Sequence, residues 1–290
     1  MNMWRNIGYE LLKMAVQKKN FVIAAGHLLF LTLCYIGFRS GGGSREFART
    51  LERAGFSEAF ANFIFSCFDG PFLARLVMIP TFLILMPILV ATLAGETVAG
   101  EMQDGSLKLA LSRPRSRTGM ILSKFFAIYL MTLFFSLYFA VVSLAAAALL
   151  RGWSSTQVIF MFGAWGVDFT TMGEPAAILR YGAMVIYFSF SQMALAAIAL
   201  FFSTIFNRTT AATIAAVTVY FVCYIAALFP FMAHLKDYLL SETMGGATAF
   251  LFWLNNIPWY KLSANLALLS IYIVVFLTLA IINFNWKDIR

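Results

Sequence analysis

The stretch ILSKFFAIYLMTLFFSLYFAVVSLAAAALL, residues 121–150, decides the fold class. Its single charged residue, Lys124, lies near its start. Crossing about 30 Å of hydrocarbon takes about 20 apolar residues in a helix. The stretch therefore predicts a membrane-spanning helix whose hydrocarbon part begins after Lys124.

Five more apolar runs are long enough to span a membrane. They cover about residues 21–38, 76–94, 181–206, 210–231 and 262–284. Pro80 and Pro87 lie inside the second run and should bend its helix. We therefore expect an all-α polytopic membrane protein with six transmembrane helices, which form one domain over residues 21–290.

The composition excludes most other classes of protein. Of 290 residues, 61% are hydrophobic and 12% are charged, and the mean hydropathy is +0.83. Soluble domains carry about 25% charged residues. An ordinary soluble enzyme, a disordered chain and a disulfide scaffold are therefore excluded, and the net charge of +8 points to a membrane surface rather than to nucleic acid.

The basic residues set the predicted orientation. One side of the six spans, with both termini, holds 12 basic and five acidic residues, whereas the other side holds nine basic and eight acidic residues. The short segments near helix ends carry the clearest bias, and positive charge marks the cytoplasmic side. Both termini should thus lie in the cytoplasm.

The N-terminal segment, residues 1–20, predicts an amphipathic helix in the cytoplasmic interface of the membrane. Trp4, Ile7 and Leu11 recur at helical spacing, and Glu10 falls largely away from this apolar stripe. Such a helix serves either as a plain lipid anchor or as a lever that also touches a partner protein. The sequence leaves both roles open.

The segment between the second and third spans reads GETVAGEMQDGSLKLALSRPRSRTGMILSKF, residues 95–125. Asp104-Gly105 is a turn signal, and Ser106 can cap a short helix that ends before Pro114. Ser116 can then cap the third span.

Leu107 and Leu111 give this short helix an apolar edge, which Arg113 follows. The arginines alone would suit an ordinary cytoplasmic loop. An apolar edge with a rigid stop suits, in addition, docking into a groove on a cytoplasmic partner.

An acidic-Gly turn, a short LxLxLSRP-like helix, basic residues and then Lys124 entering a span resemble the permease subunits of ABC-2 type transporters. The six-span group related to the nitrous oxide reductase maturation permease is the most similar. The resemblance implies a coupling helix around Glu101–Arg113 on a separate ATPase subunit, with the N-terminal helix beside it. It also implies two permeases and two ATPases per complex, in the cytoplasmic (inner) membrane of a bacterium or archaeon, with ATP and Mg on the ATPase.

The chain itself is not expected to be an enzyme or to hold a cofactor. Gly95 and Gly100 have the spacing of a phosphate-binding loop, but Glu101 stands where its lysine should be. Three dispersed cysteines and two histidines predict no metal site. The energy source should therefore lie on another chain.

Mild polar residues mark the only candidates for a substrate path. Ser189, Ser191 and Gln192 cluster in the fourth span. In the fifth loop, Trp253, Trp259 and Tyr260 suit either an aromatic belt or, by the resemblance, a short helical re-entrant element. We expect a permease that exports or moves an unidentified substrate; the alternative is a non-transporting membrane assembly factor driven by an ATPase partner.

Overall fold

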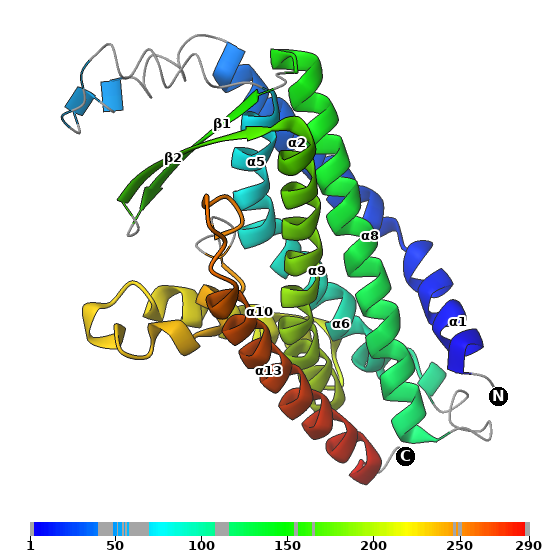
Figure 1. Cartoon of the computed structure of the whole chain (residues 1–290). Helices are drawn as coiled ribbons and strands as arrows, with labels where there is room; N and C mark the ends of the chain where they lie inside the picture. The colour runs from blue at the N-terminus through cyan, green and yellow to red at the C-terminus, as the bar shows by residue number, and fades with distance from the viewer. Residues whose placement is uncertain are drawn as a thin grey trace.

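The computed structural model describes residues 3–39, 49–50, 52–53, 55, 57, 70–107, 116–153, 156–163, 166–245, 248 and 251–287. Within these ranges, six helices are long and apolar enough to cross a membrane (Figure 1). The expected all-α polytopic fold is confirmed. The N-terminal helix and the C-terminal end of the last helix lie at the same end of the bundle, as an even number of spans requires.

The helices follow the predicted order along the chain. The bounds are α1 (Met3–Ala15), α2 (Lys18–Arg39), α5 (Gly70–Pro80), the π-helix η1 (Thr81–Leu85), α6 (Met86–Gln103), α8 (Arg117–Arg151), α9 (Glu174–Ile205), α10 (Thr209–Ala226) and α13 (Trp259–Trp286). Together α5, η1 and α6 make up the second span.

The second span is longer than its apolar run predicts. It is helical over Gly70–Gln103, rather than 76–94. Hydropathy alone ends the run at charged residues, but in the structure these charged side chains have partners in the bundle. Arg75 lies 4.6 Å from the Trp253 ring, and Lys19 forms an ion pair with Glu96. The helix therefore continues past its charged positions.

Two local predictions from the sequence are confirmed. The helix of the second span is interrupted between the two prolines: Pro80 ends α5, and Pro87 lies in the first turn of α6. The side chain of Ser116 accepts a hydrogen bond from the backbone N–H of Gly119 at 3.1 Å and so caps α8. Both features depend on residues close in sequence, which is why the sequence predicts them.

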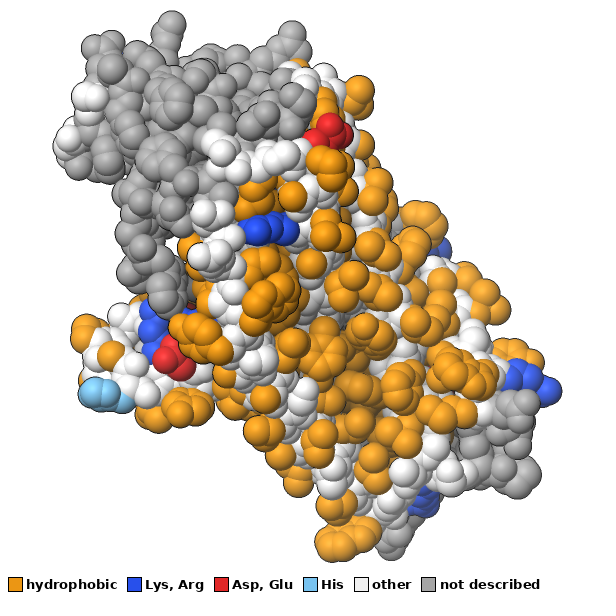
Figure 2. Space-filling view, in the orientation of Figure 1, with side chains coloured by type: hydrophobic (Ala, Val, Ile, Leu, Met, Phe, Trp, Pro, Cys, Tyr) orange, Lys and Arg blue, Asp and Glu red, His pale blue; other side chains and the backbone are white. Residues whose placement is uncertain are grey.

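Helix α9 forms the centre of the bundle and packs against α6, α8, α10 and α13. Its alanine-rich stretch, residues 194–199, is buried throughout, because small side chains let neighbouring helices approach closely. Few of the side chains of α2, α10 and α13 are buried. Hydrophobic side chains accordingly cover much of the visible face (Figure 2), as a surface in contact with lipid requires.

A β-hairpin between α8 and α9 was not expected from the sequence. Strands β1 (Thr156–Gly163) and β2 (Gly166–Gly173) pair antiparallel, with Phe160 opposite Phe169. The sequence does contain a signal for it, since β-branched and aromatic residues fill both segments and Gly163 and Gly166 flank the turn. This signal covers few residues and is much weaker than the helical pattern of the spans.

The fifth loop forms short helical turns, η2 (Pro230–Met232), η3 (Lys236–Tyr238) and α11 (Leu240–Thr243). Arg180 of α9 donates hydrogen bonds to the carbonyls of Phe252 at 3.2 Å and Leu254 at 2.6 Å and holds the loop against the bundle. Trp259 and Tyr260 are exposed, as an aromatic belt predicts, but Trp253 is buried. The belt interpretation is therefore wrong for Trp253, which lies inside against Arg75.

Candidate functional site

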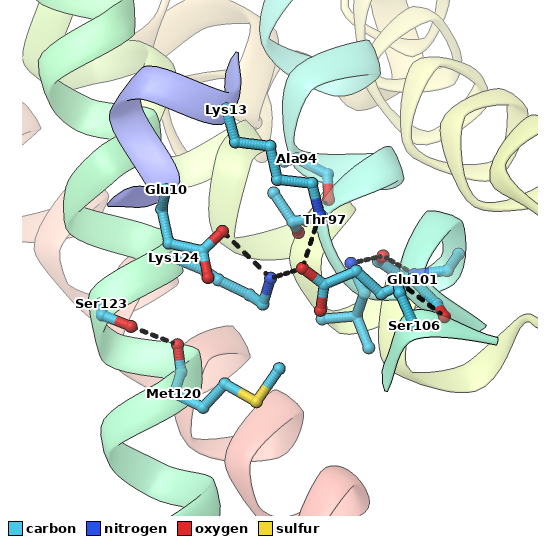
Figure 3. Close-up of polar contacts among 12 residues, drawn as sticks. Glu10, Lys13, Ala94, Thr97, Glu101, Ser106, Met120, Ser123 and Lys124 are labelled. Atoms are coloured by element: carbon cyan, nitrogen blue, oxygen red, sulfur yellow. Dashed lines mark hydrogen bonds and ion pairs between the residues drawn. The ribbon is translucent and has the colours of Figure 1, made fainter. Parts of the chain in front are cut away.

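Four charged side chains from three helices meet at the end of the bundle where α1 lies (Figure 3). Lys124 Nζ of α8 lies 2.6 Å from Glu101 Oε1 of α6 and 3.2 Å from Glu10 Oε2 of α1. Lys13 Nζ of α1 reaches the same Glu101 oxygen at 2.8 Å. We call these four residues the ionic cluster. It joins the N-terminal helix to the second and third spans.

The ionic cluster is buried to different depths. The side chain of Lys124 is 0% exposed and that of Glu101 is 8% exposed, whereas that of Lys13 is 55% exposed. A buried ammonium is costly unless it is closely paired and hydrogen-bonded. Lys124 therefore depends on its two carboxylates, while Lys13 adds a partner from the side of the solvent.

The fold explains how these residues come together. Glu10 and Lys13 are three residues apart and so lie on one side of α1. Glu101 lies in the last turn of α6, and Lys124 lies about two turns into α8. Helix α1 packs along α8, which places the two acids on either side of Lys124.

Helix α1 exists where the sequence predicts it, but it is rotated from the expected face. Ile7 is buried and Leu11 packs partly against the core, whereas Trp4 is 82% exposed. Glu10 was expected largely off the apolar stripe; this was wrong, because Glu10 is buried where it meets Lys124. The ion pair between Glu10 and Lys124 thus occupies a position between α1 and α8 that apolar side chains would otherwise fill.

The expectation for Lys124 also changes. The sequence places this lysine before the hydrocarbon part of the third span. In the structure its ammonium is enclosed by α1, α6 and α8. A lone charged residue in an apolar run is a signal for a functional or paired site, and it could have pointed to this cluster.

Lys13 lies on α1, outside the spans. Burial alone would lower the pKa of Lys13, but the hydrogen bond and the charge of Glu101 outweigh it and raise the pKa. Lys13 thus stays protonated throughout the neutral range and keeps its ion pair with Glu101.

The joint between α1 and α2 is held by Asn20. Its side-chain amide donates to the carbonyls of Met14 at 2.7 Å and Ala15 at 3.1 Å, which end α1. One residue earlier, Lys19 forms an ion pair with Glu96 of α6. Helix α6 therefore contacts the N-terminal region at two places, about one and a half turns apart.

The predicted coupling residues are placed only in part. Glu101 belongs to the ionic cluster, and Asp104 and Gly105 form an exposed turn, where Gly105 has a φ of 72°. Ser106 donates to the carbonyl of Glu101 at 3.5 Å. Leu111 and Arg113 lie outside the described residues.

The prediction for Leu107 is wrong. The sequence places it on an apolar edge that docks a partner, but its side chain is 1% exposed and belongs to the core of the bundle. It therefore anchors the start of the segment to the bundle and does not offer a docking surface.

The three candidates for a substrate path are enclosed in this structure. Ser189, Ser191 and Gln192 are all 0% exposed on the central helix α9. Ser191 donates to the carbonyl of Phe188 in its own helix at 2.8 Å. Within the described part of the chain, the Ser189 hydroxyl and the Gln192 amide have no hydrogen-bond partner.

Two further observations limit the chemistry of the chain. Residues 95–101 lie inside helix α6, whereas a phosphate-binding loop must turn between a strand and a helix. Among the described residues, no three His, Cys, Asp or Glu side chains gather as a metal site would require.

The chain is a multi-pass membrane protein with six apolar helices and an N-terminal helix packed on them. The buried ionic cluster connects three of its helices at one end. Comparison with known families gives its identity. The model of the ABC-2 family transporter proteins matches residues 10–289, and the chain belongs to this family. Comparison with curated proteins finds no match.

Proposed function

We propose that this chain is the permease subunit of an ABC transporter and couples ATP hydrolysis by a separate ATPase dimer to the export or movement of a substrate. Membership of the ABC-2 family supports a transporter membrane domain. A second copy of the chain would complete the permease, and ATP and Mg would bind only to the ATPase. The location is the cytoplasmic membrane of a bacterium or archaeon, with both termini inside.

The ionic cluster is the observation that carries this proposal. It ties α6, which leads into the predicted coupling segment, to α8, which leaves it, and to α1 beside them. A push on the turn at Asp104 and Gly105 would therefore reach two spans at once. Oppositely charged buried groups transmit such a push because separating them costs several kcal/mol.

The exposed stripe on α1 fits a place at the membrane surface. Trp4 and Leu12 of α1, and Val16 just after its end, recur four or eight residues apart and are exposed, while the opposite face of α1 packs on α8. An apolar stripe with Trp at the end of a basic helix suits the interface between lipid and water. Lipid contact and contact with the ATPase both remain open to this helix.

Affinity purification of the tagged chain from its native host tests the proposal. We expect an ATPase to be recovered with the wild-type chain. Asp104→Lys should reduce that recovery, because it reverses the charge of the exposed turn, whereas Asp237→Lys, an exposed acid in the fifth loop, should not. Wild-type recovery without any ATPase would contradict the proposal.

The alternative is a non-transporting assembly factor, similar in role to the maturation group that the sequence resembles. In that case, the ATPase-driven motion acts on a membrane or periplasmic partner instead of a transported substrate. Recovery of a folding or maturation protein together with the ATPase would favour this role.

A further inference from the structure

The second span contains a break in its α-helix between Pro80 and Pro87. Pro80 and Pro87 have no backbone N–H, so the α-helical hydrogen bonds to the carbonyls of Leu76 and Leu83 cannot form. Between the two prolines the backbone widens into the π-helix η1, in which Met86 N–H bonds to Thr81 O. Such turns are rare and often mark functional sites.

The break separates two halves with different neighbours. Before the break, α5 packs mainly on α8, where Leu73 and Val77 form a small core with Ala147. After the break, α6 packs mainly on α9 and α10. The two halves of one span therefore belong to two different packing units.

Strong local contacts make α6 one unit with α9 and α10. The Ser203 hydroxyl of α9 accepts from Ala99 N–H at 2.9 Å and donates to the Gly95 carbonyl at 2.7 Å. Gly95 also approaches α10 so closely that an added Cβ would lie 2.5 Å from Thr213 Oγ1. A displacement of α6 must therefore carry α9 and α10 with it.

The side chain of Tyr220 bonds to the break itself. The Tyr220 hydroxyl of α10 donates to the Leu83 carbonyl at 3.0 Å. This is the carbonyl that Pro87 deprives of its α-helical donor. Tyr220 is 1% exposed. Beside it, Phe82 stacks on Phe188 of α9 at 4.5 Å between ring centroids.

We propose that η1 is a hinge in the second span and that the Tyr220 hydroxyl is the latch that holds it in the observed position. Release of the bond to Leu83 allows α5, with the part of α8 packed on it, to tilt against α6, α9 and α10. The inference rests on the proposed function in one respect: the force that opens the latch arrives along α6 from the ionic cluster.

Distance measurements on the full chain alone test the latch. Spin labels go on Leu76 of α5 and Asp104 after α6, both exposed, in a chain whose three cysteines are replaced, in lipid nanodiscs. Pulsed double electron–electron resonance gives the distribution of distances between them. Tyr220→Phe should raise the ratio of a second, shorter distance to the main one about fivefold, as the loss of one hydrogen bond allows.

Tyr224→Phe is the matched control, because Tyr224 lies one turn further along α10 and is partly exposed. It should leave the distribution unchanged. A Tyr220→Phe distribution equal to that of the control would overturn the latch. No ATPase takes part, so this result is independent of the purification that tests the proposed function.

A second variant keeps the proposal testable even if Tyr220→Phe folds poorly. Pro87→Ala restores the N–H that can bond to Leu83 O. In this background the distribution should be narrow, and adding Tyr220→Phe should have no further effect. An equal effect of Tyr220→Phe with Pro87 and with Ala at position 87 would show that the bond does not act through the proline break, and would overturn the proposal.

Discussion

Lys124 Nζ lies 2.6 Å from Glu101 Oε1, and this ion pair joins the start of the third span to the end of the second. Its members are 23 residues apart, and the whole predicted coupling segment lies between them. The pair therefore closes the base of the segment, so that the two spans cannot separate there without exposing a buried charge.

Removal of Lys124 should strongly destabilise the chain. Lys124→Met leaves Glu101 and Glu10 buried without their shared cation, and breaking a buried pair in this way costs about 3–5 kcal/mol. Lys13→Met is the matched control: the side chain of Lys13 is 55% exposed, so its loss should cost no more than about 1 kcal/mol. Thermal unfolding in detergent, followed by circular dichroism, measures both. Equal unfolding midpoints for the two variants would contradict the burial argument.

Gly95 should not tolerate a side chain. An added Cβ would lie 2.5 Å from Thr213 Oγ1 and 3.1 Å from the Thr213 backbone nitrogen, so Gly95→Ala must push α10 away from α6. In Gly100→Ala, on the same helix, the added Cβ would lie 3.4 Å from Thr209 Cγ2 of α10 and 3.9 Å from Glu96 Cβ, which are ordinary van der Waals distances. This variant should be neutral or stabilising, because alanine favours a helix over glycine by up to about 1 kcal/mol.

The midpoint of thermal unfolding separates these two glycine variants. We expect a lower midpoint for Gly95→Ala and an unchanged or higher one for Gly100→Ala. A midpoint for Gly95→Ala at or above that of the wild type would mean that the two helices are not in close contact.

The parts of this fold that the sequence predicts are those whose causes are local. Apolar runs predict six spans, because a bilayer demands about 20 apolar residues wherever a helix crosses it. Ser116 and the two prolines act on backbone groups within four residues of themselves. Such effects can be inferred without knowing what lies next to the helix.

The site could be predicted only in part, because its contacts are distant in sequence. Glu10 and Lys124 are 114 residues apart, and the sequence around either residue does not indicate that the other is its partner. Leu107 looks like a docking residue from its helix alone, but the bundle covers it. Only the packing of α1 on α8 decides which polar residues face inward.

The predicted orientation of the chain can be measured directly. Asp104 and Asp237 are both exposed and should lie on opposite sides of the membrane, Asp104 in the cytoplasm. In a chain without its native cysteines, a membrane-impermeant maleimide should label Asp237→Cys in intact spheroplasts, and Asp104→Cys only after lysis. Labelling of Asp104→Cys in intact spheroplasts would reverse the orientation that the basic residues predict.

A double variant of the ionic cluster separates its structural from its coupling role. Glu101→Gln with Lys124→Met removes both members of the buried pair, so Glu10 is the one acid of the ionic cluster that loses its cation, whereas Lys124→Met alone takes that cation from Glu10 and Glu101. The double variant should therefore unfold at a higher temperature than Lys124→Met alone, as pairs that are replaced together often do.

If the ionic cluster also transmits force, this double variant should still assemble with the ATPase but no longer change the rate of ATP hydrolysis, since the neutral side chains leave α6 free to move apart from α8. The ATPase rate of the purified complex, compared with that of the complex carrying Lys13→Met, measures this. A double variant with restored stability and wild-type stimulation would restrict the ionic cluster to holding the helices together, because its charges would then be dispensable for coupling.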